Sequence, residues 1–170
     1  MRPQPVGREG AVNRTLVGVA ALLLSMSGAP VLAIPPPPPN DVRIVRVLDG
    51  HTIVVTPYGD PFKVRLACIR APQFPQGSSA LAAKAALEAL LQPGAWVSLS
   101  TRSKAADGVD LAEITPVGSR VPINLSLVQV GLAALDPLAA SPCNQEIYRE
   151  AELRAKAMQL GLWRPSPGTR

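Results

Sequence analysis

Three short segments rich in β-branched and aliphatic residues follow one another between residues 42 and 69, separated by tight-turn sequences. In Val42–Val47, apolar residues alternate with arginines, which is the pattern of a half-buried strand. The sequences Leu48-Asp49-Gly50 and Pro57–Asp60 favour turns, so His51–Thr56 and Phe62–Ile69 are expected to be the next two strands. A meander of this kind must bury its apolar face, and it therefore predicts a small, largely antiparallel sheet or barrel.

The rest of the folded region mixes helical and strand patterns in one domain without repeats. Helices are expected over Ser78–Leu91 (capped by Ser78 or Ser79), Asn124–Val130 (capped by Asn124 and closed by Gly131) and Asn144–Leu160 (capped by Asn144, with Gly161 just past its end). Strands are expected at Trp96–Ser100 and Asp110–Thr115, with a polar loop at Thr101–Val109. This order predicts an α+β fold, a five-stranded OB-type β-barrel with about three helices.

The N-terminal segment has the features of an export signal. Three arginines precede a short apolar run, Leu16–Met26, and Val31-Leu32-Ala33 offers a small-residue cleavage site, so residues 1–33 are expected to be a signal peptide. An uncleaved membrane anchor is the alternative. Residues 34–41 are then a proline-rich linker, stiff in the polyproline II conformation, or alternatively a ligand for an SH3-type domain. The domain is expected at 42–163, and 164–170 is expected to be a disordered tail.

The charge balance argues against a strong nucleic-acid binder. The formal charge of +5 falls to +3 when residues 1–33 are removed, because that segment carries three arginines and one glutamate. A mildly basic surface of this kind lacks the large positive potential typical of tight DNA or RNA binding. Few aromatic residues are placed for base stacking, and Trp163 is expected to pack the last helix against the barrel.

Two cysteines, Cys68 and Cys143, are present in the chain. An exported protein meets an oxidising compartment, so a disulfide between them is expected, with two separate buried thiols as the alternative.

Five strings then appear in one order along the folded region. They are V-L-D-G-H-T (Val47–Thr52), R-L-A-C-I-R-A-P-Q (Arg65–Gln73), G-V-D-L-A (Gly108–Ala112), I-N-L-S-L-V-Q-V-G-L-A (Ile123–Ala133) and E-A-E-L-R-A-K-A-M-Q-L-G-L-W (Glu150–Trp163). Together they resemble the conserved strings of the staphylococcal (thermonuclease-like) nuclease family across the whole folded region. The resemblance implies the OB-type barrel already expected from the strand pattern.

The resemblance also implies a phosphodiesterase chemistry that this chain largely lacks. In that family two aspartates and a main-chain carbonyl hold calcium, a glutamate activates water, and two arginines stabilise charge on the phosphate. The matching aspartate positions are His51 and Arg70 here, and the glutamate position is Gln73. The carbonyl position is Ala71, whose main-chain oxygen is present whatever the side chain.

One of the two matching arginines remains, as Arg65, and the other position is Val109. Arg65 is therefore the one catalytic side chain carried over, the calcium site is not retained, and no cofactor is expected. A pseudoenzyme is the first interpretation, because a metal, a base and an arginine are lost together.

The remaining polar residues near these strings allow more than one interpretation. His51, the single histidine, is either merely tolerated or a general base. Asp49 is expected to form an Asx turn with Gly50. Arg70 could fill the vacated cation site and pair with Asp49 or Asp110. Arg65, Arg70 and His51 could form a small anion-binding pocket, or the strand arginines could simply be solvated.

Three functional hypotheses follow. The first is an exported nuclease-like domain, periplasmic or extracellular, without catalysis, acting as a binding or structural module. The second is a phosphodiesterase that cleaves DNA or RNA with an altered metal site. The third is a weak binder of anions or nucleic acid. The partner is unknown, no stable membrane insertion is expected after signal cleavage, and a monomer is expected.

Overall fold

The computed structural model describes residues 40–73, 77–137 and 143–165. The expected signal peptide, nearly all of the proline-rich linker and residues 166–170 of the expected tail lie outside these ranges. All the elements described below belong to one compact unit, which begins at Pro36.

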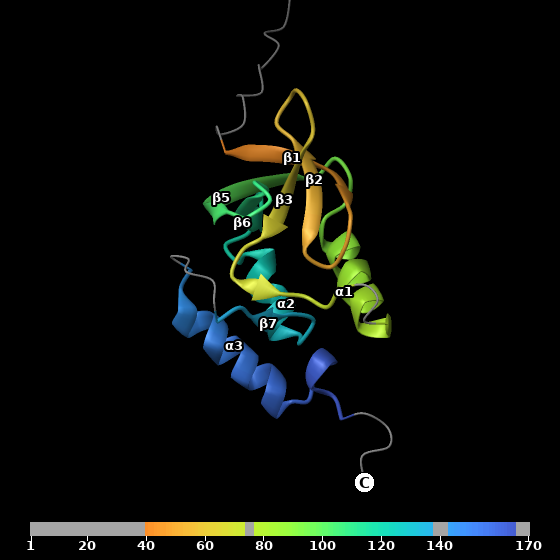
Figure 1. Cartoon of the computed structure of the whole chain (residues 1–170), viewed down its shortest axis with the longest axis vertical. Coiled ribbons are helices and arrows are strands. Elements are labelled where there is room, and N and C mark those ends of the chain that lie inside the picture. The colour runs from red at the N-terminus through yellow and green to blue at the C-terminus, as the bar shows by residue number, and fades with distance from the viewer. Residues whose placement is uncertain (1–39, 74–76, 138–142, 166–170) are drawn as a thin grey trace, which may run out of the picture. The chain divides into compact units, whose positions relative to one another are not determined.

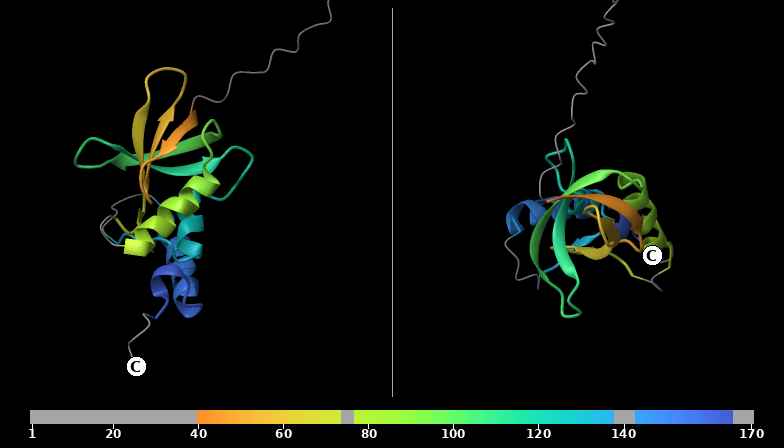
Figure 2. Two further views of the ribbon diagram at one scale, coloured as in Figure 1. Left: turned by 90° about the vertical axis from the view of Figure 1, so that its right-hand side faces the viewer. Right: turned by 90° about the horizontal axis from the view of Figure 1, so that it is seen from above.

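Five strands close into a barrel, as the strand pattern predicts (Figure 1). In their order around the barrel they are β1 (Asp41–Val47), β2 (Thr52–Thr56), β3 (Phe62–Leu66), β6 (Asp110–Pro116) and β5 (Trp96–Lys104). The pairing of β3 with β6 is parallel, and the other four pairings are antiparallel. Seen from above, the strands form a ring (Figure 2). The barrel interior is filled by aliphatic side chains such as Ile53, Val55, Val64, Val97 and Ile114, all inaccessible to solvent.

The helices gather at one end of the barrel (Figures 1 and 2). They are α1 (Gly77–Leu90), α2 (Ile123–Gln129), α3 (Gln145–Ala157) and a 3₁₀ turn, η1 (Gly161–Trp163). Helix α1 buries Ala80, Ala83 and Leu87. Asn144 caps α3 as expected, since its side chain accepts a hydrogen bond from the Ile147 amide.

Several sequence expectations about these elements are wrong. The polar loop at Thr101–Val109 is shorter, because β5 runs on to Lys104 and pairs with β6 as far as Asp110. The last helix ends at Ala157 rather than at Leu160, and Gly161 belongs to η1. The expected third strand ends at Leu66 rather than at Ile69. Ile69 belongs to a two-stranded pairing that was not expected, in which β4 (Ile69–Arg70) lies antiparallel to β7 (Ala134–Leu135).

The expectation that Asn124 caps α2 is also wrong. Pro122 occupies the cap position, and Asn124 lies inside the helix with no solvent exposure. Its side-chain amide donates to the carbonyls of Ala67 and Ala112, and its oxygen accepts from the Ile114 amide. A buried amide with three such partners ties α2 to β6 and to the segment after β3.

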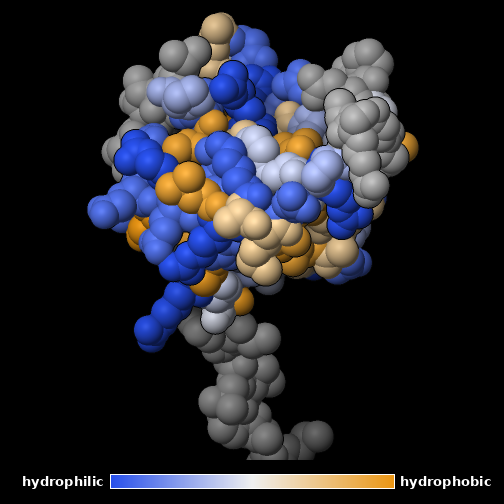
Figure 3. All heavy atoms as spheres, turned by 90° about the horizontal axis from the view of Figure 1, so that it is seen from below, coloured by the Kyte–Doolittle hydropathy of each residue, from blue (hydrophilic) through white to orange (hydrophobic). Residues whose placement is uncertain are grey.

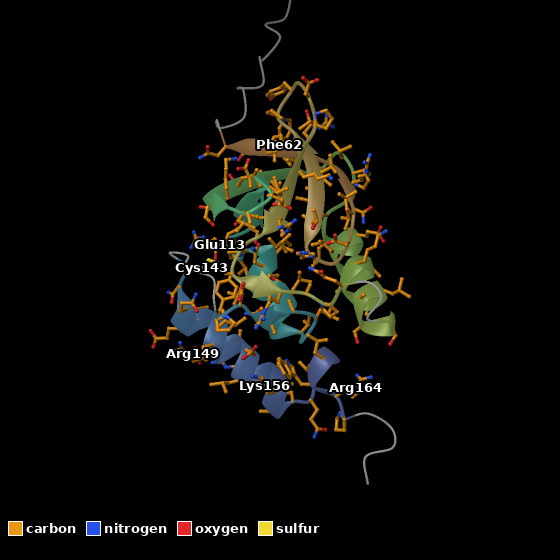
Figure 4. All side chains as sticks on the ribbon, in the orientation of Figure 1. Phe62, Glu113, Cys143, Arg149, Lys156 and Arg164 are labelled. Atoms are coloured by element: carbon orange, nitrogen blue, oxygen red, sulfur yellow. A yellow bond between two sulfur atoms is a disulfide. The ribbon has the colours of Figure 1, made fainter. Side chains whose placement is uncertain are left out.

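The expected disulfide is present and joins Cys68, just after β3, to Cys143, just before α3. Its Cα atoms are 6.3 Å apart, and 75 positions separate the two cysteines in sequence. The buried carboxylate of Glu113 lies beside the two sulfurs and accepts a hydrogen bond of 2.7 Å from the Tyr148 hydroxyl (Figure 4). Because Cys68 follows β3 and Cys143 precedes α3, the disulfide links the end of the barrel covalently to the start of α3.

The surface of the described residues is mixed in character. From below, hydrophilic and hydrophobic side chains are interspersed (Figure 3). Exposed apolar side chains on α3 include Ile147 and Leu153. None of the helices in the described part of the chain is long and apolar enough to cross a membrane.

Candidate functional site

The β1–β2 turn, the end of β3 and the segment leading into α1 meet on one side of the barrel. The Leu66 amide donates to the His51 carbonyl over 2.8 Å, and Thr52 pairs with Arg65 in the β2–β3 ladder. These backbone contacts place the two strings that resemble the nuclease motifs side by side. A cavity of about 890 Å³ opens there.

The cavity lining brings together most of the positions that match the family's catalytic and metal-binding residues. His51, Arg65, Arg70 and Gln73 all line it, and so do Lys104, Asp136, Ser103, Leu111 and Leu162. Lys104 and Asp136 were missed by sequence reasoning. Lys104 fell in the expected polar loop, and Asp136 reaches the site only through the β4–β7 pairing.

His51 has a carboxylate neighbour that the sequence did not reveal. Its Nδ1 lies 2.7 Å from Oδ1 of Asp49, although the ring N–H is not aligned for a linear hydrogen bond. The same carboxylate oxygen accepts the His51 backbone amide over 2.9 Å, which is the Asx turn expected at Asp49-Gly50. The turn that shapes the loop therefore also places an acid against the imidazole.

Gln73 completes this group. Its Nε2 is 3.2 Å from Nε2 of His51, on the side of the ring opposite Asp49. The substitutions at the first aspartate position and at the glutamate position are thus physically linked, because the two replacement side chains contact each other. Neither sequence motif alone could show this, since the residues are 22 positions apart.

The interaction with His51 controls the ionisation of Asp49. Partial burial opposes the charged form of this carboxylate, but the hydrogen bonds and charge of His51 outweigh burial and lower the pKa of Asp49 to about 2. Asp49 is therefore ionised throughout the physiological range.

Arg65 is paired with an acid from the β5–β6 loop. One of its terminal nitrogens donates to Oδ2 of Asp107 over 2.8 Å, and this hydrogen bond is the main cause of a lowered Asp107 pKa. The Nε of Arg65 is buried and has no hydrogen-bond partner among the described residues. A buried, cationic donor without an acceptor costs free energy unless a ligand supplies one.

Arg70 does not pair with Asp49 or Asp110, so the expectation of a salt bridge to either is wrong. The pairing of β4 with β7 carries it instead towards Asp136, with Nε of Arg70 3.6 Å from Oδ1. Asp49 is held by His51, and Asp110 lies against Lys104. The side chain of Arg70 remains 61% exposed, so it is available to a solute in the cavity.

These side chains do not fit a calcium ion. Calcium takes six to eight oxygen ligands, and carboxylates supply most of its charge compensation. Here an imidazole and a guanidinium stand at two of the acid positions, and the nearest acid, Asp49, is already engaged by His51. Cys68, Glu113 and Cys143 form another close group of potential ligands, but its two sulfurs are joined in the disulfide.

What remains in the cavity is a cationic, hydrogen-bonding site with an imidazole held between an acid and an amide. Such a site can bind anions, and it can exchange a proton at the imidazole.

In comparisons with known proteins, no protein-family model matches the chain. The sequence is 31% identical over 150 residues to a micrococcal nuclease from Shigella flexneri, and the match covers 84% of this chain and 86% of that protein.

Proposed function

The chain belongs to the micrococcal nuclease family, and from that premise we propose that it is an exported member that binds phosphate-bearing anions without calcium-dependent hydrolysis. One observation carries the proposal. The cavity of about 890 Å³ that contains the residues of the family's motifs is lined by cationic side chains and not by a set of acids that could bind calcium.

The charges of the cavity favour an anion. Arg65, Arg70 and Lys104 line it, and a described acid neighbours each of them. The acids reduce the positive potential, so we expect weak binding rather than tight binding. The buried Nε of Arg65 is an unfilled donor that a phosphate oxygen would satisfy.

The family's usual hydrolysis is disfavoured on physical grounds. Arg70 would repel a dication at close range, even after solvent screening. Gln73 cannot remove a proton from water. Loss of a single base or electrostatic group commonly lowers a rate by about a hundredfold or more, and here the metal and the base are lost together.

Export is proposed from the signal-like residues 1–33 and the proline-rich run that follows them. The disulfide between Cys68 and Cys143 is compatible with an oxidising compartment.

The proposal is tested with the full chain and a fluorescently labelled single-stranded oligonucleotide, by anisotropy and by gel. We expect micromolar or weaker binding that falls with salt with a slope near −2, as about three cations on a single strand require. Arg65→Gln and Arg70→Gln should each weaken binding severalfold. Arg149→Gln is the matched control, since Arg149 is exposed on α3 (Figure 4) and does not line the cavity.

Two results would overturn the proposal. The first is calcium-dependent cleavage of DNA that disappears in Arg65→Ala, which would restore the altered-site nuclease. The second is binding that is equally strong in Arg65→Gln, Arg70→Gln and the wild-type chain, which would place the anion elsewhere.

A further inference from the structure

We propose that this cavity catalyses a metal-independent cleavage of RNA, in which His51 takes the proton of a ribose 2′-hydroxyl and that oxygen attacks the adjacent phosphate. The proposal rests on the proposed binding of phosphodiesters in the cavity. It concerns a reaction that needs neither a bound cation nor an activated water.

The surroundings of His51 select the tautomer that a general base requires. The carboxylate of Asp49, 2.7 Å from Nδ1, favours a proton on that nitrogen. The Gln73 amide, with its Nε2 3.2 Å from Nε2 of the ring, offers a donor to a ring nitrogen that accepts. Nε2 therefore carries the lone pair, and both His51 and Gln73 line the cavity. The imperfect alignment at Nδ1 is usual for catalytic hydrogen bonds before substrate binds.

RNA supplies the nucleophile that the missing metal and glutamate would otherwise have to prepare. The 2′-oxygen is attached next to the scissile phosphate, so the attack is intramolecular and gains a large effective concentration. DNA lacks this hydroxyl. A site that has lost its means of activating water can therefore act on RNA alone.

The step balances without an oxidant, a reductant or a metal. The 2′-hydroxyl replaces the Gln73 amide at Nε2 of His51, its proton passes to that nitrogen, and the 2′-oxygen forms a bond to phosphorus. The bond from phosphorus to the 5′-oxygen breaks, and that oxygen takes a proton from solvent. The products are a 2′,3′-cyclic phosphate end and a 5′-hydroxyl end.

Arg65 is the catalytic residue best placed to stabilise the negative charge that develops on the phosphate oxygens. The hydrogen bond from the Leu66 amide to the His51 carbonyl holds the backbones of residues 51 and 65 next to each other. The buried Nε of Arg65, which has no acceptor among the described residues, can then donate a hydrogen bond to the phosphate oxygen on which that charge develops. Lys104 lines the same cavity and adds a second positive charge.

Asp49 acts through His51 and is therefore a positioning residue. Asp49→Asn keeps an oxygen that can accept the His51 amide in the Asx turn, but it removes the charge beside Nδ1. We expect the cleavage rate to fall at least about tenfold. The loss should fall on kcat, with KM and RNA binding within about twofold, because the ring loses the carboxylate that favours a proton on Nδ1 while the turn is kept. A purely structural role for Asp49 would instead raise KM or weaken RNA binding.

The experiment incubates the full chain, in EDTA, with end-labelled single-stranded RNA and with DNA of the same sequence. We expect slow cleavage of RNA only, with cyclic phosphate and 5′-hydroxyl ends identified by mass spectrometry. His51→Gln should lower the rate at least about a hundredfold, as loss of a general base does, while RNA binding by anisotropy stays within about twofold. Arg149→Gln, purified identically, should cleave as the wild type does.

The possible negative results separate a failure of the cleavage proposal from a failure of the binding proposal. RNA that binds with the expected dependence on Arg65 and Arg70 but stays intact would overturn this inference and leave the binding proposal standing. Absence of binding by either nucleic acid would overturn both. Cleavage that persists in His51→Gln would remove His51 from the reaction and overturn the inference.

Discussion

At the scale of single residues, Asp49 has a double role: its carboxylate shapes a turn and holds an imidazole. The pKa of Asp49 is about 2 because hydrogen bonds and charge from His51 outweigh the effect of burial. A carboxylate whose folded-state pKa is depressed stabilises the fold above its unfolded value. That contribution is complete above about pH 4 and is lost as the pH falls through about 2. After screening at this partly exposed site it is worth about 1 kcal/mol.

The first prediction concerns this carboxylate. In His51→Ala, the Asp49 pKa should rise partway towards its ordinary value, since the close contact with the imidazole and its charge are lost while the backbone amide of residue 51 remains. Carboxyl chemical shifts in a pH titration by NMR measure it. Gln73→Ala is the matched control, because Gln73 contacts the opposite side of the ring and its removal should leave the Asp49 pKa low. A pKa still near 2 in His51→Ala would contradict this account.

Asn124 shows at the same scale why some positions escape sequence reasoning. An asparagine before an apolar helical run is a good cap candidate, and the composition of the segment fits that interpretation. Its true role depends on β6 and on the segment after β3, whose carbonyls and amide it meets only once the chain is folded. Asn144, by contrast, makes the local cap contact that sequence spacing predicts.

At the scale of elements, the end of α2 touches η1 backbone to backbone. Gly131 has a φ of 71°, and a β-carbon there would lie 2.3 Å from the Leu160 carbonyl oxygen. The Leu162 amide donates to the Gly131 carbonyl over 2.8 Å. A side chain at position 131 must therefore push the two elements apart.

The second prediction follows from this contact. Gly131→Ala should lower the free energy of unfolding by about 3 kcal/mol or more, because backbone strain and a backbone clash act together. Gly108→Ala is the matched control: φ is 79°, but nothing lies within 4 Å of the added carbon, so the expected loss is about 1 kcal/mol. Urea denaturation compares the two variants. Equal losses would show that the approach of η1 to α2 costs nothing to open.

The elements also show what periodicity can and cannot predict. The strand alternation, the turn sequences and the helical spacing locate the five barrel strands and the three α-helices, because these patterns are local. The two-residue β4–β7 pairing is too short to leave a pattern, and it decides which acid Arg70 meets. The sequence could therefore indicate that His51, Arg65 and Arg70 lie near one another, as their shared cavity shows, but it could not indicate the ion pairs of the two arginines.

At the scale of the whole molecule, the disulfide is the longest covalent constraint in the described chain. It closes a loop of 75 positions, from the end of β3 to the start of α3. In the chain-entropy treatment, a loop of this length restricts the unfolded state by about 4 kcal/mol.

The third prediction is that the double variant Cys68→Ser, Cys143→Ser loses up to about 4 kcal/mol of unfolding free energy, measured by urea denaturation. The wild-type chain in a reducing agent should match the double variant to within about 1 kcal/mol, which separates the crosslink from the substitution itself. An unchanged denaturation midpoint on reduction would show that the unfolded chain is not restricted by this bond.

The parallel pairing of β3 with β6 has a consequence for how the chain folds. β3 is completed at Leu66, but its partner residues, Asp110 to Ala112, follow much later in the sequence. While the chain folds, β1, β2 and β3 can therefore form an open meander in which β3 has an unpaired edge. Until β6 takes its place, that edge can recruit a strand from another copy of the chain, so the protein is most prone to aggregate before residues 67–112 have folded onto the meander.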